Sequence, residues 1–201
     1  GGRVPFTYLN PPEGTRALLF DCDGTLVDTM GLHKVVWAEM FARFDFELTD
    51  EWWEETGNVA LEPFVLAAIP DASDELILEL REESIALFDE RLHLLEPLEH
   101  VVDLARRYHG VLPMAVCSGG FRQPVIGSLE AVGIVDLFDF IVTADDVVNS
   151  KPAPDLYLAG MRGIGFGPDE VVVYEDSEIG IASAVAAGVR TIIDVRLPEP
   201  S

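Results

Sequence analysis

Short apolar runs alternate with amphipathic stretches over most of the chain. We predict strands at Ala17–Asp21, Val111–Cys117, Phe138–Thr143, Val171–Glu175 and Thr191–Asp194. Between and after these runs, apolar positions recur with helical spacing at residues 98–109, 121–132, 154–164 and 178–187. Gly133 and Gly188 follow two of these segments, where a helix C-cap is expected. This order of elements predicts an α/β fold with a Rossmann-like parallel sheet core of about five main strands, covered by helices on both faces.

The segment after the first predicted strand has a different pattern. Residues 29–96 show no strand signal, and apolar residues such as Leu32, Val36 and Met40 recur with the period of a helix. We therefore expect two domains, an α/β core formed by residues 1–28 and 97–201 and an inserted α-helical domain at residues 29–96. The insertion holds four basic residues against 17 acidic ones, which gives it a net charge of −13.

The composition narrows the classes of partner. The chain of 201 residues has 13 basic and 36 acidic residues and a formal net charge of −23, which repels nucleic acids and anionic lipids. No apolar run approaches the roughly 18 residues of a membrane span, and the start of the chain lacks the pattern of a secretory signal. We expect a cytoplasmic protein, a monomer or weak homodimer, with neither nucleic acid nor membrane as partner. The acidic excess fits either a salt-rich habitat or a codon bias.

Two carboxylates stand together where the first predicted strand ends. Asp21 and Asp23 follow the apolar run at residues 17–20 and precede the turn residues Gly24 and Thr25. Along a strand, positions 21 and 23 share a face, so their like charges converge. Such a pair is costly unless a cation lies between the carboxylates or one of them holds a proton, and both are catalytic arrangements. An acidic turn without a function is the alternative.

Other polar residues follow the later predicted strands. Ser118 and Gly119 come after the second strand, and Lys151 lies beyond the third. Glu175 and Asp176 end the fourth strand. In a parallel sheet the carboxyl ends of the strands share one edge and border the ligand crevice. We therefore expect these residues to face the same crevice as the carboxylates of the first strand.

The chemistry of these residues suits phosphate and a divalent cation. A hydroxyl and backbone N–H groups before a helix, as at Ser118 and Gly119, can together hold an anion. Lys151 is one of only two lysines among the 13 basic residues, and a flexible ammonium suits a point-charge contact to phosphate. Carboxylate oxygens beside phosphate are the usual setting for Mg²⁺. Each residue also has an ordinary alternative as a turn residue, a solvated lysine or a helix-capping acid.

Cys22 and Cys117 are the only cysteines in the chain. A disulfide framework is not expected at this count in a chain of this size. We predict that both are small buried residues on the reverse face of their strands. Reactive thiol chemistry is disfavoured, because neighbouring acidic groups raise the pKa of a thiol.

Together these motifs resemble those of the haloacid dehalogenase-like superfamily. The residues that carry the resemblance are Asp21-Cys22-Asp23-Gly24-Thr25-Leu26-Val27-Asp28, then Ser118, Lys151-Pro152 and Glu175-Asp176. Their order and spacing match across essentially the whole chain. The helical insertion, with His33 and Trp37, resembles the small cap of the β-phosphoglucomutase-like branch. Within that branch the chain is most similar to the sugar phosphatases, including fructose-1-phosphatase-like proteins.

The resemblance implies a Mg²⁺-dependent phosphatase that works through an aspartyl-phosphate. It makes Asp21 the nucleophile and Asp23 the group that protonates the leaving oxygen and then activates water. It implies a metal site formed by the Asp21 side chain, the Asp23 backbone carbonyl and Asp176, with Glu175 left open as a ligand. The phosphoryl oxygens would be held by Ser118, Gly119 and Lys151.

The substrate implied is a small phosphorylated metabolite, selected by a cap that closes over the site. The loop that binds a second phosphate in β-phosphoglucomutases corresponds here to residues 56–60, Thr-Gly-Asn-Val-Ala, which contain no cation. This favours a monophosphate such as a sugar phosphate over a bisphosphate. His33, near the hinge, is a candidate substrate contact, with structural packing as its alternative. The cap arginines Arg43, Arg81 and Arg91 are expected to form surface ion pairs.

Two other activities are compatible with these motifs. One is a phosphosugar mutase of the β-phosphoglucomutase type, which retains the phosphate on the sugar, and the other is a phosphoglycolate phosphatase. Dehalogenation is disfavoured, because family members with that chemistry lack an acid like Asp23. A non-enzymatic binding protein is disfavoured too, since the full set of motif residues is present.

Overall fold

A computed structural model describes residues 7–197, and their contacts form two compact units. The first unit runs up to Asp28 and resumes at Glu96, and the second comprises Thr29–Leu95. The first unit is built on five strands: β1 (Ala17–Phe20), β2 (Met114–Cys117), β3 (Phe140–Val142), β4 (Val171–Glu175) and β5 (Thr191–Asp194). Each strand runs parallel to its neighbours.

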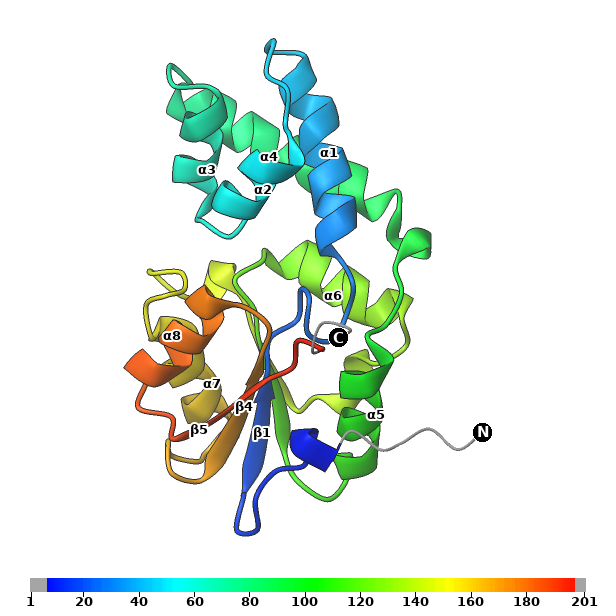
Figure 1. The fold of residues 1–201 in the computed structure, drawn as a ribbon, viewed down its shortest axis with the longest axis vertical. Coiled ribbons are helices and arrows are strands. Elements are labelled where there is room, and N and C mark those ends of the chain that lie inside the picture. The colour runs from blue at the N-terminus through cyan, green and yellow to red at the C-terminus, as the bar shows by residue number, and fades with distance from the viewer. Residues whose placement is uncertain (1–6, 198–201) are drawn as a thin grey trace. The chain divides into compact units, whose positions relative to one another are not determined.

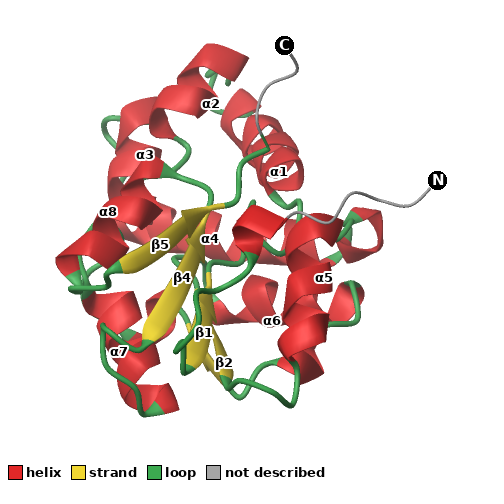
Figure 2. Ribbon diagram, turned by 60° about the horizontal axis from the view of Figure 1, so that its bottom comes forward, coloured by secondary structure: helices red, strands yellow, loops and turns green. Residues whose placement is uncertain are grey.

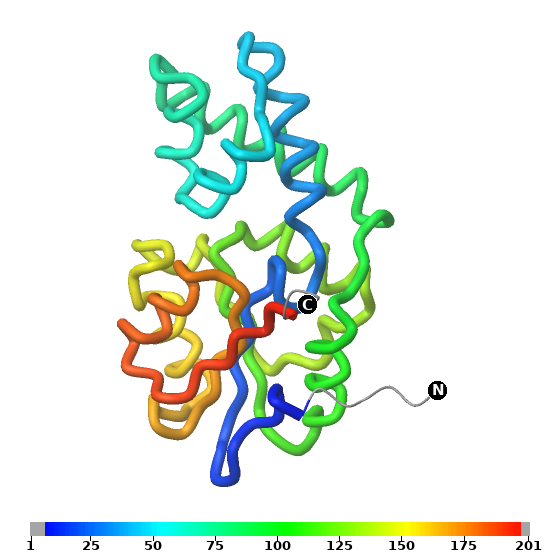
Figure 3. The backbone as a smooth tube through the Cα atoms, viewed as in Figure 1, coloured from blue at the N-terminus to red at the C-terminus, as the bar shows by residue number. Residues whose placement is uncertain are grey.

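Strand β1 lies at the centre of this sheet. The strand order is β3-β2-β1-β4-β5, and Leu18 of β1 lies beside Met114 of β2 and Val172 of β4. In Figure 3 the blue segment of β1 accordingly runs between green and orange segments. The chain leaves β1 towards one edge of the sheet and leaves β4 towards the other. This makes β1 and β4 a topological switch point, where open α/β sheets bind their ligands.

Helices cover both faces of the sheet. The helices of the first unit are α5 (Glu99–Tyr108), α6 (Arg122–Ala131), α7 (Asp155–Ile164), α8 (Glu178–Ala186) and the short 3-10 helices Thr7–Leu9, Val135–Leu137 and Ala144–Asp146. Helices α7 and α8 pack on one face, against a buried cluster that includes Leu19, Cys117 and Val173. Helices α5 and α6 lie on the other side (Figure 1 and Figure 2). Because both faces are covered, every residue of β1 and β4 is buried, and the predicted α/β fold is confirmed.

Strand β2 is shorter than predicted. It begins at Met114 rather than at Val111, because Gly110 turns the chain with a φ of +79°. The N–H groups of Val111 and Leu112 then donate to the Tyr108 carbonyl and not to a neighbouring strand. These apolar residues belong to the turn that follows α5, and their hydrophobicity alone does not distinguish this turn from a strand.

Strand β3 is also shorter than predicted, at Phe140–Val142 instead of residues 138–143. The preceding 3-10 helix ends at Leu137, and the Asp139 carboxylate accepts the Met114 N–H at 2.9 Å. After the strand, Thr143 and Asp146 form a capping box for another 3-10 helix. At both ends a carboxylate therefore accepts a backbone N–H group, that of Met114 before the strand and that of Thr143 after it.

The two predicted glycine C-caps are confirmed. Gly133 follows α6 with a φ of +75°, and Gly188 follows α8 with a φ of +85°. After α6, the Ile134 N–H donates to the Leu129 carbonyl at 2.9 Å, which satisfies a carbonyl of the last turn. These left-handed positions favour glycine and send the chain back towards the sheet.

The second unit is helical (Figure 1). Its helices are α1 (Met30–Ala42), α2 (Asp50–Thr56), α3 (Leu61–Ala68), α4 (Asp74–Asp89) and the 3-10 helix Leu92–Leu94. Thr49 and Ser73 cap α2 and α4, since their side-chain oxygens accept backbone N–H groups of the first turn at 3.2 and 3.1 Å. None of the helices within residues 7–197 is long and apolar enough to cross a membrane.

Aromatic rings form much of the core of the second unit. Phe41 and Phe64 have ring centroids 5.4 Å apart, and Trp52 contacts both rings. Three arginines of the second unit form the surface ion pairs that were predicted, namely Arg43 with Glu83 at 2.6 Å, Arg91 with Glu39 at 2.9 Å and Arg81 with Glu82 at 3.8 Å.

Candidate active site

Asp21 and Asp23 lie in a tight loop after β1. The strand ends at Phe20, but the Asp21 N–H still donates to the Tyr174 carbonyl of β4 at 3.0 Å. The Cys22 carbonyl then accepts three N–H groups from residues 25–27. The strand alternation that we used to place Asp21 and Asp23 on one face therefore does not extend to Asp23, and this premise was wrong. The loop nevertheless keeps the charge of Asp23 close enough to raise the pKa of Asp21, as one of several smaller contributions.

Gly24 and Thr25 connect this loop to the end of β4. Gly24 has a φ of +80°, and a Cβ atom at this position would lie 2.2 Å from Oδ2 of Asp176. The Thr25 hydroxyl lies 3.2 Å from Asp21 Oδ2 and 3.1 Å from Asp176 Oδ1. Thr25 was not predicted as a site residue, and its only signal in the sequence was its position directly after Gly24.

The ammonium group of Lys151 lies between the carboxylate of Asp21, directly after β1, and that of Glu175, the last residue of β4. Its Nζ atom is 2.9 Å from Asp21 Oδ1, 2.7 Å from Glu175 Oε1 and 3.0 Å from the Cys117 carbonyl oxygen. Burial alone would lower the pKa of Lys151, but the charges of Asp21 and Glu175 outweigh burial and raise this pKa. The lysine side chain is 10% exposed, so it is a largely buried cation and not a solvated loop residue.

Three carboxylates gather beside this lysine. Asp21, Glu175 and Asp176 each offer one oxygen, and these oxygens lie within 4.8 Å of one another. Burial raises the pKa of Asp21 to about 8 against the opposing charge of Lys151, and the charge of Asp176 adds to the rise. Burial likewise raises the pKa values of Glu175 and Asp176. A hard divalent cation such as Mg²⁺ fits this donor set, because it would relieve the repulsion among the oxygens.

The carboxylate of Asp23 lies on the side of Ser118. Ser118 is fully buried at the end of β2, and its Oγ atom lies 3.4 Å from Asp23 Oδ2. The same Oγ atom accepts the Gly120 N–H at 3.0 Å. Gly119 is exposed between them, and a Cβ atom there would meet no atom of the described residues within 4 Å. The metal contact expected from the Asp23 backbone carbonyl stays a prediction.

Tyr157, in the first turn of α7, is a site residue that the sequence did not indicate. Its hydroxyl donates to Glu175 Oε1 at 2.7 Å, and its ring centroid lies 5.0 Å from Lys151 Nζ. The side chain is fully buried. An aromatic residue at a helical position that faces a sheet usually belongs to the core, so the sequence contained no signal for this contact.

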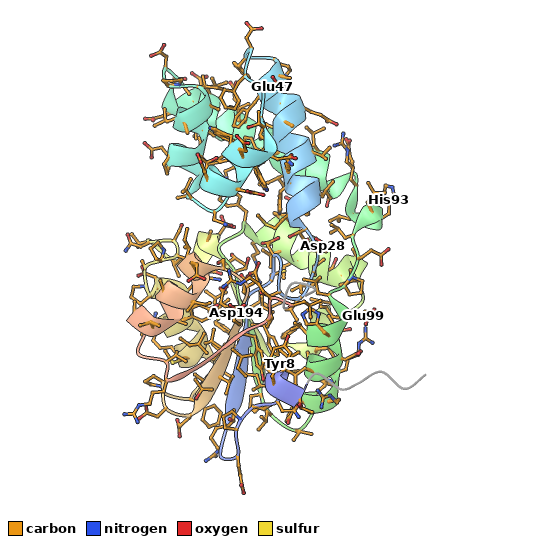
Figure 4. The ribbon with its side chains drawn as sticks, viewed as in Figure 1. Tyr8, Asp28, Glu47, His93, Glu99 and Asp194 are labelled. Atoms are coloured by element: carbon orange, nitrogen blue, oxygen red, sulfur yellow. The ribbon has the colours of Figure 1, made fainter. Side chains whose placement is uncertain are left out.

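The end of β5 is tied to the start of α8. Asp194, labelled in Figure 4, is the last residue of β5, and its Oδ2 accepts a hydrogen bond from Arg196 Nη2 at 2.5 Å. The same nitrogen donates to Glu178 Oε1 at 2.8 Å. Hydrogen bonds from Arg196 lower the pKa of Asp194. The network links β5 to the first residue of the helix that follows Glu175 and Asp176 in the chain.

His33 belongs to the second unit. Its ring stacks on Phe88 with centroids 4.3 Å apart and an angle of 13° between the ring planes. The packing alternative named for His33 is therefore present in the structure. Its contact with substrate stays a prediction.

Comparison with known proteins places the chain in a family. Residues 18–193 match the family model described as haloacid dehalogenase-like hydrolase. The chain is 34% identical over 200 residues to the fructose-1-phosphate phosphatase YqaB of Escherichia coli, covering 92% of this chain and 98% of that protein. It is 30% identical over 198 residues to the protein CbbY of Rhodobacter capsulatus, covering 89% of this chain and 84% of that protein.

A solved structure shares the fold. The crystal structure of CbbY from Rhodobacter sphaeroides in complex with phosphate has a TM-score of 0.81, with 24% sequence identity over 90% of this chain and 86% of that chain. The chain therefore belongs to the haloacid dehalogenase-like hydrolase family, as its motifs predicted. The predicted enzyme class, a phosphatase of this family, is confirmed by the family match and by the phosphatase relative.

Proposed function

We propose that the protein is a Mg²⁺-dependent phosphatase that hydrolyses a small phosphomonoester through an aspartyl-phosphate on Asp21. The observation that carries the proposal is the position of Asp21, 2.9 Å from the buried Lys151 ammonium and clustered with Asp176. A sugar phosphate is the substrate class we favour. The fructose-1-phosphate phosphatase relative supports this class, and so does the absence of a basic residue from residues 56–60.

The donor set defines how Mg²⁺ would be held. The side chains of Asp21 and Asp176 and the backbone carbonyl of Asp23 are the proposed ligands. Glu175 Oε1 accepts hydrogen bonds from Lys151 and Tyr157, and Oε2 accepts one from the Asp176 N–H, so Glu175 is left out of the proposed ligands. The bound ion would neutralise charge on the transferring phosphoryl group.

The first chemical step transfers the phosphoryl group to the enzyme. An oxygen of Asp21 attacks phosphorus, and the bond from phosphorus to the leaving oxygen breaks. Asp23 donates a proton to that leaving oxygen, so the alcohol departs neutral. The Ser118 hydroxyl, the Gly119 N–H and the Lys151 ammonium bind the remaining oxygens. These donors supply the electrostatic stabilisation on which phosphoryl transfer chiefly depends.

The second step returns the enzyme to its starting state. A water molecule attacks phosphorus and gives a proton to the Asp23 carboxylate, while the bond from phosphorus to Asp21 breaks. Inorganic phosphate leaves, Asp21 is a carboxylate again and Asp23 has regained its proton. Each of the two carboxylates thus has a separate task, which explains why both lie in the loop after β1.

Phosphate release with Mg²⁺ tests this proposal over a panel of sugar phosphates, phosphoglycolate, nucleotides and pyrophosphate. We expect Asp21→Asn to lower turnover at least about 10³-fold, because the amide is no nucleophile. The circular dichroism spectrum should stay that of the wild type. Asp136→Asn, which alters an exposed acid of the same unit, is the matched control and should keep full activity. Substantial phosphatase activity of Asp21→Asn would refute the nucleophile assignment.

The same assay separates hydrolysis from mutase chemistry. A phosphosugar mutase would convert β-glucose 1-phosphate into glucose 6-phosphate and release little free phosphate. We expect free phosphate as the main product. Accumulation of glucose 6-phosphate without phosphate release would replace the phosphatase assignment by the mutase alternative.

A further inference from the structure

All three hydrogens of the Lys151 ammonium have protein acceptors. They are Asp21 Oδ1, the Cys117 carbonyl oxygen and Glu175 Oε1, at 2.9, 3.0 and 2.7 Å from Nζ. The shortest of these contacts is the one to Glu175. The direction of the ammonium therefore depends on where the Glu175 carboxylate is held.

The Glu175 carboxylate is enclosed by α7, α8 and the loop after β4. The Tyr157 hydroxyl donates to Oε1 at 2.7 Å, and the Asp176 N–H donates to Oε2 at 3.2 Å. Gly180 of α8 lies directly behind the carboxylate, because a Cβ atom there would be 2.0 Å from Oε2. Glu175 and Tyr157 are both fully buried. Among these contacts, only the tyrosine hydroxyl shares Oε1 with Lys151.

We propose that Tyr157 is a positioning residue that fixes Glu175 and, through Glu175, keeps the Lys151 ammonium directed at Asp21. Its importance for catalysis rests on the proposed function, in which Lys151 binds phosphoryl oxygens. A lysine that turns one hydrogen towards a phosphoryl oxygen must release one of its present acceptors. The tyrosine hydroxyl keeps Oε1 hydrogen-bonded during that exchange, so the buried carboxylate does not have to follow the lysine.

A second buried tyrosine provides a matched control. Tyr174 precedes Glu175 in β4, is fully buried and donates its hydroxyl to the Leu9 carbonyl at 2.6 Å. It points to the face of β4 opposite to that of Glu175 and stacks on Phe20. Tyr157→Phe and Tyr174→Phe therefore each remove one buried hydroxyl and keep the ring, but only Tyr157→Phe removes a bond to Glu175.

The scarcity of lysine allows a direct measurement on Lys151. Lys34 and Lys151 are the only lysines, so protein labelled with ¹⁵N-lysine shows at most two side-chain ammonium signals in an NMR spectrum. Lys34→Arg, made in every sample, leaves the signal of Lys151 alone. The hydrogen exchange of this ammonium with water then reports how firmly its three acceptors hold it.

We expect a slowly exchanging Lys151 signal in the Lys34→Arg background and in its Tyr174→Phe variant. In Tyr157→Phe, exchange should be at least about tenfold faster, or the signal should be lost, because a hydrogen bond to a charged group has been removed. Equal hydrogen-exchange rates of the Lys151 ammonium in Tyr157→Phe and Tyr174→Phe would overturn the proposal. So would the absence of a protected Lys151 signal in the parent protein, since the ammonium would then not be held.

Turnover of p-nitrophenyl phosphate with Mg²⁺ links the position of Lys151 to catalysis. We expect Tyr157→Phe to lower kcat/KM about tenfold and Tyr174→Phe to change it less than about twofold. An unchanged kcat/KM in Tyr157→Phe would overturn the catalytic part of the proposal. If the wild type released no phosphate from any ester, the proposed function would fail instead, and the NMR comparison would still decide whether Tyr157 positions Lys151.

Discussion

Asp21 is buried beside a cation and two further acids. Burial raises the pKa of its carboxyl group from 3.8 to about 8, while the charge of Lys151 lowers this pKa and the charge of Asp176 raises it. A carboxyl group with a raised pKa in the folded protein keeps a proton that it would lose in the unfolded chain. Its contribution to stability is therefore present below the unfolded pKa and is lost as pH rises through the folded pKa.

The raised pKa of Asp21 predicts that the stability of the protein depends on pH when a metal chelator is present. Between pH values of about 5 and 8, the free energy of unfolding of the wild type should fall relative to that of Asp21→Asn, whose amide does not titrate. The slope is at most about 1.4 kcal/mol per pH unit for one group. Urea unfolding of both proteins across this range measures the difference. A difference that stays constant or grows with pH would contradict the raised pKa of Asp21.

The sequence indicated the residues that lie directly at strand ends. Asp21, Ser118 and Asp176 were predictable because the carboxyl ends of parallel strands share one edge. Tyr157 and Thr25 were not, since their roles depend on hydrogen bonds to Glu175, Asp21 and Asp176 that no spacing in a single sequence reveals. Such contacts become visible only when β1, β4 and α7 have been placed side by side.

At the scale of elements, β4 and α8 approach each other closely around Glu175. Ser177 caps α8 by accepting the Gly180 N–H at 3.0 Å, and the Glu175 carboxylate lies against Gly180. Glycine is a poor helix former, and alanine would be favoured at such a position by up to about 1 kcal/mol. The contact with Glu175 explains why a helix of the core has glycine here.

Gly180→Ala should therefore destabilise the protein despite its better helix propensity. The added Cβ atom would meet the Glu175 carboxylate, and we expect a loss of about 1–3 kcal/mol in the free energy of unfolding. Val185→Ala, at a residue 61% exposed on the same helix, is the control and should change stability by less than about 0.5 kcal/mol. Chemical denaturation measures both variants. A Gly180→Ala protein at least as stable as the wild type would show that Glu175 can move away without cost.

Element types were predictable from apolar spacing, whereas some boundaries were not. Strand β4 begins and ends as predicted, and α7 ends as predicted at Ile164 but begins at Asp155, one residue later than predicted, because Pro154 is its N-cap. Strand β2 lost its first residues to a turn at Gly110, and β3 lost residues to side-chain caps at Asp139 and Thr143. Turn and cap hydrogen bonds compete with the sheet for the same backbone groups. The hydrophobic pattern of the sequence does not predict which of these hydrogen bonds form.

For the whole molecule, the charge of −23 and the proposed phosphate site have to be reconciled. The anionic substrate that we propose approaches a protein of the same sign, so the field of the whole molecule does not attract it. The buried ammonium of Lys151 and the proposed Mg²⁺ then supply the local positive charge.

The overall sheet and helix order followed from the hydrophobic pattern. The role of the second unit as a substrate-selecting cap stays a prediction, because substrate choice depends on side chains outside the motifs.

The covalent step on Asp21 is the central claim, and mass spectrometry of the quenched protein and its peptides tests it most directly. The protein is mixed with Mg²⁺ and a sugar phosphate that it hydrolyses, quenched in acid within milliseconds and then digested with a protease. We predict a mass increase of about 80 Da, one phosphoryl group, in the wild type, located on the peptide that contains Asp21, and none in Asp21→Asn. Rapid hydrolysis without any phosphorylated protein, or a phosphoryl group on another residue, would contradict the account.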